Sequence, residues 1–250
     1  MSNTFRKHLG IFSALVLGCL SLSAAETKPA PVFDAANKTF KFGPKEMVFA
    51  DNGTFKVMSS GRCIATGSFF MSTAFRPSQN NSAAKVNPGP YKDGPIYVES
   101  CKADPATKTV TVEGKLPFHK PGTPVQLGSW KQTAALTADG KVDIVLDFEL
   151  PEGQSPNRVK GFTLTFPTAT GFTYGKKPVF RAFDAEKVIS PYTGPAILPK
   201  YADEKDSIAW EFPETKIRYI FNHRPGRNTI YFTPHTQYKT CRFHVRFNPM

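Results

Sequence analysis

The sequence predicts an all-β protein, a large antiparallel β-sandwich of the jelly-roll or supersandwich type with at most one short helix. Three observations support this fold class. Gly and Pro interrupt the chain so often that the longest stretch without either runs from His235 to Asn248, which suits short strands better than long helices. The chain contains 22 Phe among 250 residues, and aromatic residues favour a pleated surface. Apolar and polar residues also alternate in several segments, as they do in half-buried strands.

The first 25 residues predict a signal peptide. Arg6 and Lys7 form a basic start, Leu9 to Leu22 is apolar, and Ser23-Ala24-Ala25 supplies small residues before a cleavage site. Residues 26–31 then form a Pro-containing spacer. We therefore expect a secreted or periplasmic protein without a transmembrane segment, because no later apolar run is long enough to span a bilayer. Val16-Leu17-Gly18-Cys19 is similar to a bacterial lipobox, so a lipid anchor on Cys19 stays open as the alternative.

After the leader, residues 32–250 are expected to form a single β-sandwich domain, with a division near residue 195 as the alternative. Four segments alternate clearly and predict strands with one apolar face. They are Val142–Leu150, Phe162–Phe166, Ile217–Phe221 and Arg242–Phe247. Weaker candidates are Thr39–Phe42, Met47–Ala50, Phe55–Met58, Cys63–Thr66, Ile96–Cys101, Thr109–Glu113, Val125–Leu136, Val179–Phe183, Ile208–Phe212 and Thr229–Thr233.

Turns and longer connections separate these strands. Asp51-Asn52-Gly53 and Asp139-Gly140 predict hairpin turns, because Gly adopts the positive φ that such turns need. Tyr201–Trp210 is the one segment that suggests a short helix. Ser78–Pro95 is expected to be a long surface loop. Ser190–Ser207, which contains three prolines, is expected to be a loop or a crossover between sheets.

The net charge of +12 is concentrated near the end of the chain. Thr215 to Met250 carries seven Lys and Arg residues and no Asp or Glu. For an exported protein this positive field fits an acidic polysaccharide, a cell-wall polymer or an anionic membrane surface better than a nucleic acid. A generally basic soluble surface is the alternative.

Cysteine and histidine spacing predicts no metal site, and we expect no cofactor. Cys63, Cys101 and Cys241 remain after the leader, so one disulfide with a free thiol and three reduced thiols both stay open. No Cys-x-x-Cys motif occurs, and the gaps between His223, His235 and His244 match no compact metal signature.

The C-terminal strand supplies the main candidate binding face. Arg242, His244 and Arg246 share one side of Arg242–Phe247, because side chains alternate along a strand. Arg218 has the same phase in Thr215–Phe221, so pairing of the two strands would place three arginines and a histidine on one face. Such a face suits carboxylate or sulfate groups, since arginine binds them in a bidentate manner. A solvated outer face is the alternative.

Aromatic side chains provide a second set of candidates. Trp130, Trp210, Tyr219 and Tyr231 could stack on sugar rings if they are exposed. Single aromatic residues on strands can equally pack in the core.

An enzyme remains an open alternative. His223, Arg224 and Arg227 lie together in Asn222–Arg227 between two strands. They could abstract a proton beside a uronic acid, as a polysaccharide lyase requires. An ordinary basic hairpin has the same composition. Asp143, Asp147 and Glu149 share one strand face without the geometry expected of a glycosidase pair, and no hydrolase or nucleotide-binding motif occurs.

No motif identifies a family. An export signal before a Phe-rich β domain resembles, at the level of fold class alone, the non-catalytic β-sandwich modules of secreted polysaccharide-processing proteins. We therefore expect a carbohydrate-binding or accessory protein, with acidic polysaccharide as the partner. A polysaccharide lyase or hydrolase and a non-catalytic surface-assembly protein are the alternatives.

Overall fold

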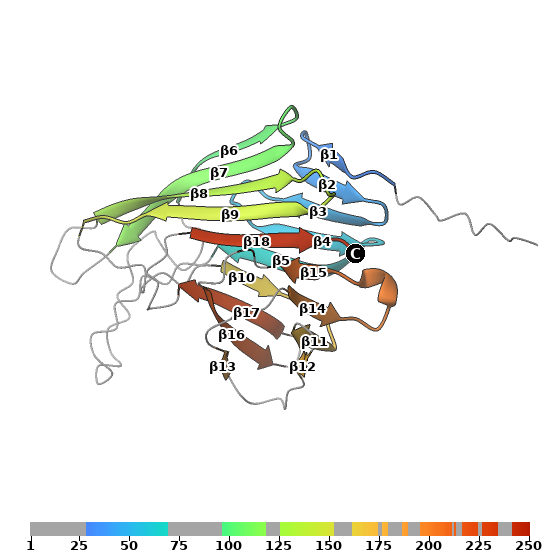
Figure 1. The fold of residues 1–250 in the computed structure, drawn as a ribbon. Helices are drawn as coiled ribbons and strands as arrows, with labels where there is room; N and C mark the ends of the chain where they lie inside the picture. The colour runs from blue at the N-terminus through green and yellow to red at the C-terminus, as the bar shows by residue number, and fades with distance from the viewer. Residues whose placement is uncertain are drawn as a thin grey trace, which may run out of the picture.

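The computed structural model describes residues 29–69, 97–118, 126–152, 162–174, 177–179, 187–189, 196–211, 213, 217–224, 227–234 and 242–250. The predicted signal peptide with Cys19, the loop predicted at Ser78–Pro95 and Cys241 lie outside these residues. Most of the described chain is β-strand, and the strands form two antiparallel sheets (Figure 1). The predicted all-β sandwich is thereby confirmed.

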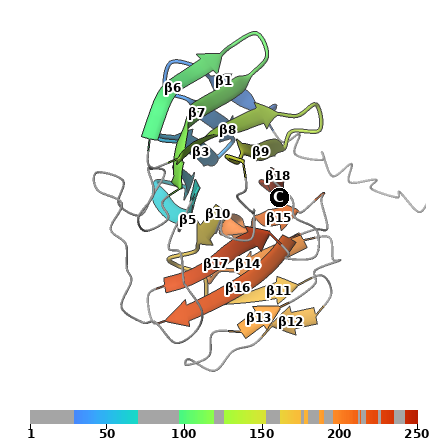
Figure 2. The same ribbon diagram turned by 90° about the vertical axis from the view of Figure 1, so that its left-hand side faces the viewer.

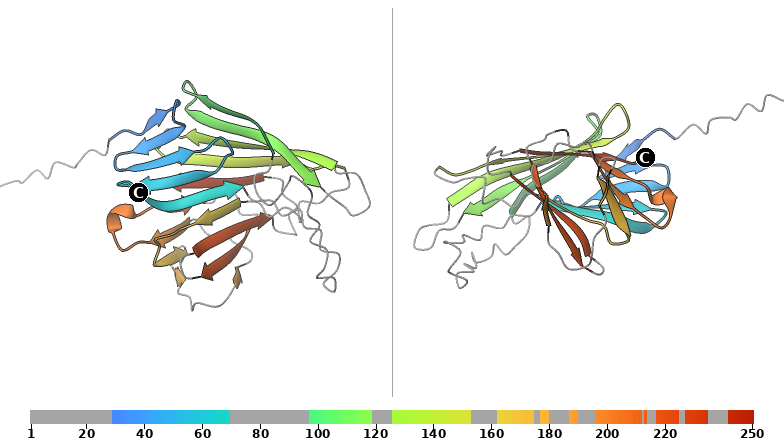
Figure 3. Two further views of the ribbon diagram at one scale, coloured as in Figure 1. Left: turned by 180° about the vertical axis from the view of Figure 1, so that it is seen from behind. Right: turned by 60° about the horizontal axis from the view of Figure 1, so that its bottom comes forward.

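Sheet A has the strand order β1-β2-β3-β4-β5-β10-β17-β16-β13. Its strands are β1 (Val32–Asp34), β2 (Thr39–Phe42), β3 (Lys45–Phe49), β4 (Phe55–Ser59), β5 (Arg62–Phe69), β10 (Phe162–Thr165), β13 (Lys187–Ile189), β16 (Ile217–Arg224) and β17 (Arg227–Pro234). The first five strands follow one another as a meander, which Figure 3 shows from behind.

Sheet B has the order β12-β11-β14-β15-β18-β9-β8-β7-β6. Its strands are β6 (Tyr97–Asp104), β7 (Thr109–Phe118), β8 (Gln126–Leu136), β9 (Val142–Glu149), β11 (Gly171–Tyr174), β12 (Lys177–Val179), β14 (Ala196–Lys200), β15 (Ala209–Glu211) and β18 (Arg242–Asn248). The outer face of β6 to β9 and β18 is turned toward the viewer in Figure 1.

The chain crosses repeatedly between the two sheets. β13 belongs to sheet A and β14 to sheet B, so the chain changes sheet between them. β14 and the 3-10 turn at Glu204–Asp206 lie inside Ser190–Ser207, so that segment is not the uninterrupted loop or crossover that was predicted. Strands that follow residue 195 also pair with strands that precede it, since β17 pairs with β10 and β18 pairs with β9. The described strands on either side of residue 195 therefore share both sheets.

The core forms where the apolar faces of the two sheets meet, and the predicted alternation is confirmed in it. Val142, Ile144, Leu146 and Phe148 of β9 are buried, as are Phe243, Val245 and Phe247 of β18. The largest fully buried side chains come from both sheets, and they are Trp210, Phe40, Phe55, Phe166, Phe243, Phe247 and Met47.

An aromatic cluster joins the sheets at the centre of this core. The ring of Phe55 in sheet A lies 5.8 Å from that of Trp210 in sheet B, and the Trp210 ring lies 5.2 Å from that of Phe247. Gly67 makes room for Phe55, because a Cβ at that position would lie 2.0 Å from the Phe55 ring. Gln132 adds a polar link, since its Nε2 donates to the carbonyl of Gly53 at 2.8 Å.

The two predicted turns are confirmed, whereas the segment predicted as a short helix contains a single 3-10 turn and the start of β15. Gly53 has φ +79° and Gly140 has φ +77°, the left-handed values that their turns require. Within the predicted helical segment the structure has one 3-10 turn, η2 (Glu204–Asp206), and Asp203 caps it by accepting from the Lys205 N–H. The buried Asp206 of η2 is paired with Arg62 of β5.

The pairing assumed for the candidate basic face is wrong. β16, which carries Arg218, pairs with β13 and β17 in sheet A, whereas β18 pairs with β15 and β9 in sheet B. Figure 2 shows β16 and β17 side by side, separate from β18. Arg218 therefore does not share a sheet face with Arg242, His244 and Arg246, because equal phase along two strands does not make the strands neighbours.

Candidate functional site

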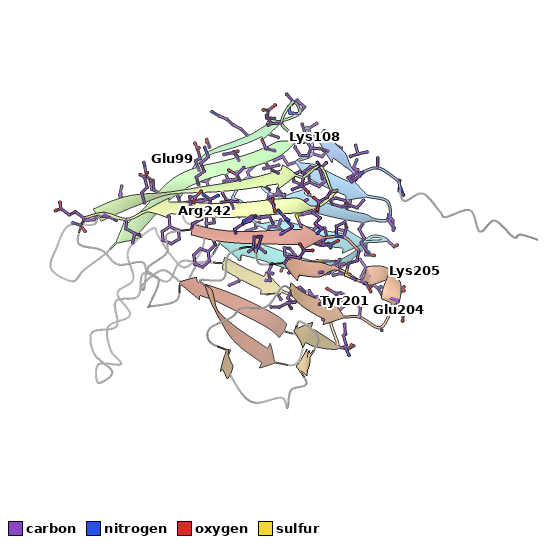
Figure 4. The ribbon with its side chains drawn as sticks, in the orientation of Figure 1. Glu99, Lys108, Tyr201, Glu204, Lys205 and Arg242 are labelled. Carbon is purple, nitrogen blue, oxygen red and sulfur yellow. The ribbon has the colours of Figure 1, made fainter. Side chains whose placement is uncertain are left out.

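A shallow groove of about 500 Å³ runs across the outer face of sheet B. Residues of β6, β7, β8, β9 and β18 line it, and they are Glu99, Glu113, Gly114, Lys115, Ser129, Trp130, Lys131, Asp147, Phe148, Glu149 and Arg242. Glu99 and Arg242, which mark its two sides, both lie on the face shown in Figure 4. The volume falls within the range of small-molecule sites.

Strand register places the groove's charges in a row. Glu113 is opposite Lys131, Lys131 is opposite Asp147, and Asp147 is opposite Arg242. Each of these residues alternates with buried neighbours on its own strand, so all four side chains emerge on the outer face. A ligand lying across the strands would therefore meet negative and positive groups in turn, at the strand spacing of roughly 4.8 Å.

The ion pairs of the groove are exposed. The Lys131 Nζ lies 2.8 Å from the Glu113 Oε1, the Lys115 Nζ lies 3.6 Å from the Glu99 Oε2, and the Arg242 Nη1 lies 3.6 Å from the Asp147 Oδ1. The hydrogen bond from Lys131 holds the pKa of Glu113 below its usual range. The side chains in these pairs are 37–55% exposed. Exposed pairs contribute only about 0–1 kcal/mol each, so a ligand can replace them at small cost.

A second polar cluster on the same face is more tightly packed. The Arg246 Nε and Nη2 donate to the two carboxylate oxygens of Asp143 at 2.6 and 3.0 Å, and the His244 Nε2 lies 3.0 Å from the Asp143 Oδ1. Burial raises the pKa of Asp143, but the hydrogen bonds from Arg246, together with the nearby imidazole of His244, outweigh it and leave that pKa lowered. Nearby, the Lys141 Nζ donates to Glu211 at 2.9 Å, and this bond raises the pKa of Lys141.

The three candidate ligand-binding residues of β18 do not all lie in the groove. Arg242 lines the groove and is 52% exposed, whereas Arg246 and His244 are 29% and 17% exposed and are engaged with Asp143. Among these three predicted ligand-binding residues, Arg242 is thus the one that lines the groove. Arg246 and His244 instead tie β18 to β9.

The tryptophans lie in the core. Trp130 is 2% exposed and Trp210 is 0% exposed. Neither ring is available to stack on a sugar, so the stacking role considered for them is wrong. Both occupy inward positions of sheet B, Trp130 on β8 and Trp210 on β15.

The remaining candidates belong to β16 and β17, for which the structure describes the backbone pairing. Arg218, Tyr219, His223 and Arg224 lie on β16, and Arg227 and Tyr231 lie on β17. Arg224 is opposite Arg227 in the hairpin, and His223 is opposite Asn228. The side chains of these residues lie outside the described part of the structure, so the lyase hypothesis remains a prediction.

Cys63 and Cys101 are free thiols, and they lie on β5 of sheet A and β6 of sheet B. Burial raises the pKa of each thiol, which disfavours the reactive thiolate.

In the described ranges, no three His, Cys, Asp or Glu side chains are grouped as a metal site would require. The same ranges contain no helix that is long and apolar enough to cross a membrane.

Sequence reasoning missed most of the groove. The alternation in β9 predicts that Asp147 and Glu149 share a strand face, whereas no sequence motif marks the other charged and polar residues of the lining, Glu99, Glu113, Lys115, Ser129 and Lys131. The alternation in Val125–Leu136 indicates that Lys131 and Trp130 point to opposite faces of the sheet. It does not show which strands are the neighbours of this segment. Comparison with protein-family models and with curated protein sequences gives no match.

Proposed function

We propose that the protein is an exported carbohydrate-binding protein and that it binds polysaccharide in the groove on the outer face of sheet B. The observation that carries this proposal is the row of exposed charged side chains Glu113, Lys131, Asp147 and Arg242 across four adjacent strands. The export signal in the sequence supports the compartment in which such a ligand is found.

Sugar hydroxyl groups both donate and accept hydrogen bonds, and the groove offers both kinds of partner. Carboxylates such as Asp147 and Glu149 accept, while the Lys131 ammonium and the Arg242 guanidinium donate. Hydrogen bonds that involve an ionised group are stronger than those between neutral groups. An alternating row can therefore bind a hydroxyl-rich chain along its length.

The size of the groove also suits a chain molecule. Five strands at roughly 4.8 Å spacing extend about 19 Å across the sheet, so several sugar rings can lie on it at once. The groove is open and polar, which fits a polymer that binds at its surface better than a small apolar ligand that needs enclosure.

Replacing both Lys131 and Arg242 with alanine is expected to weaken polysaccharide binding by at least tenfold, because two charged donors are lost from the row. Affinity electrophoresis on gels that contain individual polysaccharides measures the effect. Both side chains are more than half exposed, so the variant is expected to fold normally, which circular dichroism checks.

The matched control replaces Lys56 and Lys205 with alanine. Both are exposed and lie outside the groove, on β4 and η2, and their loss changes the net charge by the same amount. Retained binding in this control and lost binding in the groove variant support the proposal. Equal behaviour of the two variants would contradict it, and lack of binding by the unmodified protein would favour the surface-assembly alternative.

A further inference from the structure

The groove is not basic, although the chain as a whole is. Its lining carries the carboxylates of Glu99, Glu113, Asp147 and Glu149 and the cationic groups of Lys115, Lys131 and Arg242. Four negative charges against three positive charges give the lining a formal net charge of −1. The positive excess of the whole chain, +12, is therefore not found at this site.

Each cation of the groove already has a carboxylate beside it. Lys131 is paired with Glu113, Lys115 with Glu99 and Arg242 with Asp147. An anionic polymer would have to displace these carboxylates, which would then remain close to its own charges. Like charges brought together in a binding site weaken binding and suppress wrong partners.

Glu149 makes this repulsion stronger. Its Oε2 accepts a hydrogen bond from the Ser129 hydroxyl at 3.1 Å, and no ion pair is recorded for it within the described residues. It is exposed at the end of β9, two residues beyond Asp147 on the same face. Since Arg242 balances the charge of Asp147, Glu149 accounts for the formal net charge of −1 in the lining.

The other arginines near the C-terminus do not offset this charge. Arg246 is held by both oxygens of Asp143. Arg218, Arg224 and Arg227 belong to β16 and β17 in sheet A, whereas the groove lies on sheet B. A neutral sugar chain has no such conflict, because its hydroxyl groups can donate to Asp147 and Glu149 and accept from Lys131 and Arg242.

We infer that the groove takes an uncharged, hydroxyl-rich polysaccharide and that Asp147 and Glu149 exclude acidic polymers from it. This inference rests on the proposed function and specifies its ligand. It also replaces the acidic polysaccharide expected from the charge of the sequence with a neutral one.

The test compares the unmodified protein with an Asp147→Asn, Glu149→Gln variant by affinity electrophoresis. Laminarin and galactomannan serve as neutral polymers, and polygalacturonate and alginate as acidic polymers. We expect the unmodified protein to be retarded by at least one neutral polymer and by neither acidic one. The variant, whose groove has a formal charge of +1, should bind an acidic polymer at least tenfold more tightly at low salt. Its affinity for the neutral polymer should fall, because the neutral amide oxygens of Asn and Gln accept hydrogen bonds more weakly than ionised carboxylates.

A Glu46→Gln, Glu204→Gln variant provides the control, since it changes the net charge equally on β3 and η2, away from the groove. A gain of acidic-polymer binding in the groove variant alone supports the inference. An equal gain in both variants would overturn it, because net charge and not the groove would then set the preference. Binding of polygalacturonate or alginate by the unmodified protein would overturn the inference while leaving the proposed function standing, and absence of binding to all four polymers would overturn both.

Discussion

Replacing Trp210 with alanine is expected to lower the free energy of unfolding by about 3–5 kcal/mol, the range for removing a large aromatic side chain from a core. Trp210 is fully buried, and its ring lies between Phe55 of sheet A and Phe247 of sheet B. Its loss would leave a cavity where the two sheets meet. Chemical denaturation followed by far-ultraviolet circular dichroism measures the change.

Leu127→Ala is the control for this effect. Leu127 is 51% exposed, so its truncation should alter the free energy of unfolding by no more than about 0.5 kcal/mol. If Trp210→Ala costs no more than Leu127→Ala, the ring does not join the sheets, and its exclusion from sugar stacking would have to be reconsidered.

Replacing Lys45 with methionine is expected to cost about 2–4 kcal/mol of unfolding free energy, because a hydrogen bond from a charged donor contributes roughly 1.5–3 kcal/mol and water can restore part of the loss. Lys45 is 6% exposed at an inward position of β3. Its ammonium group donates to the backbone oxygens of Ser207, Pro249 and Met250 at 2.7, 2.6 and 2.9 Å. It thereby fastens β3 of sheet A to the segments that precede β15 and follow β18 of sheet B.

Lys56→Met gives the matched comparison for Lys45, since Lys56 is exposed on the adjacent strand β4. Thermal and urea unfolding of both variants should show a large loss for Lys45→Met and a small one for Lys56→Met. Equal losses would contradict a specific role for the three hydrogen bonds to backbone oxygens.

The strands were predictable because a half-buried strand imposes a period of two on its own sequence. Val142–Glu149 and Arg242–Asn248 show this period, and both have the expected apolar face in the structure. Strand partners follow from contacts far apart in the chain, which a local pattern does not encode. Arg218 and Arg242 have equal phase in their strands and yet lie in different sheets.

The environment of single residues was harder to predict for the same reason. Trp210 lies in a run of three buried residues, Ile208 to Trp210, so burial was the better interpretation of that segment. The sequence around Arg246 shows no acidic partner, whereas in the structure Asp143 lies opposite it on β9 and accepts its hydrogen bond. The groove is formed by five strands that lie side by side in sheet B. On any one of these strands its charged residues have the pattern of ordinary surface residues, so the sequence of a single strand does not predict the groove.

The most direct test of the central claim, that the outer face of sheet B binds a neutral polysaccharide, is a two-dimensional NMR titration of the isotope-labelled protein with an oligosaccharide of the neutral polymer that it binds. We expect the amide signals of Ser129, Lys131, Asp147 and Arg242 to shift together, with those of Lys56 and Lys205 unchanged. Shifts confined to β16 and β17, or no shift in the β7, β8 and β9 strands at saturating ligand, would contradict the claim.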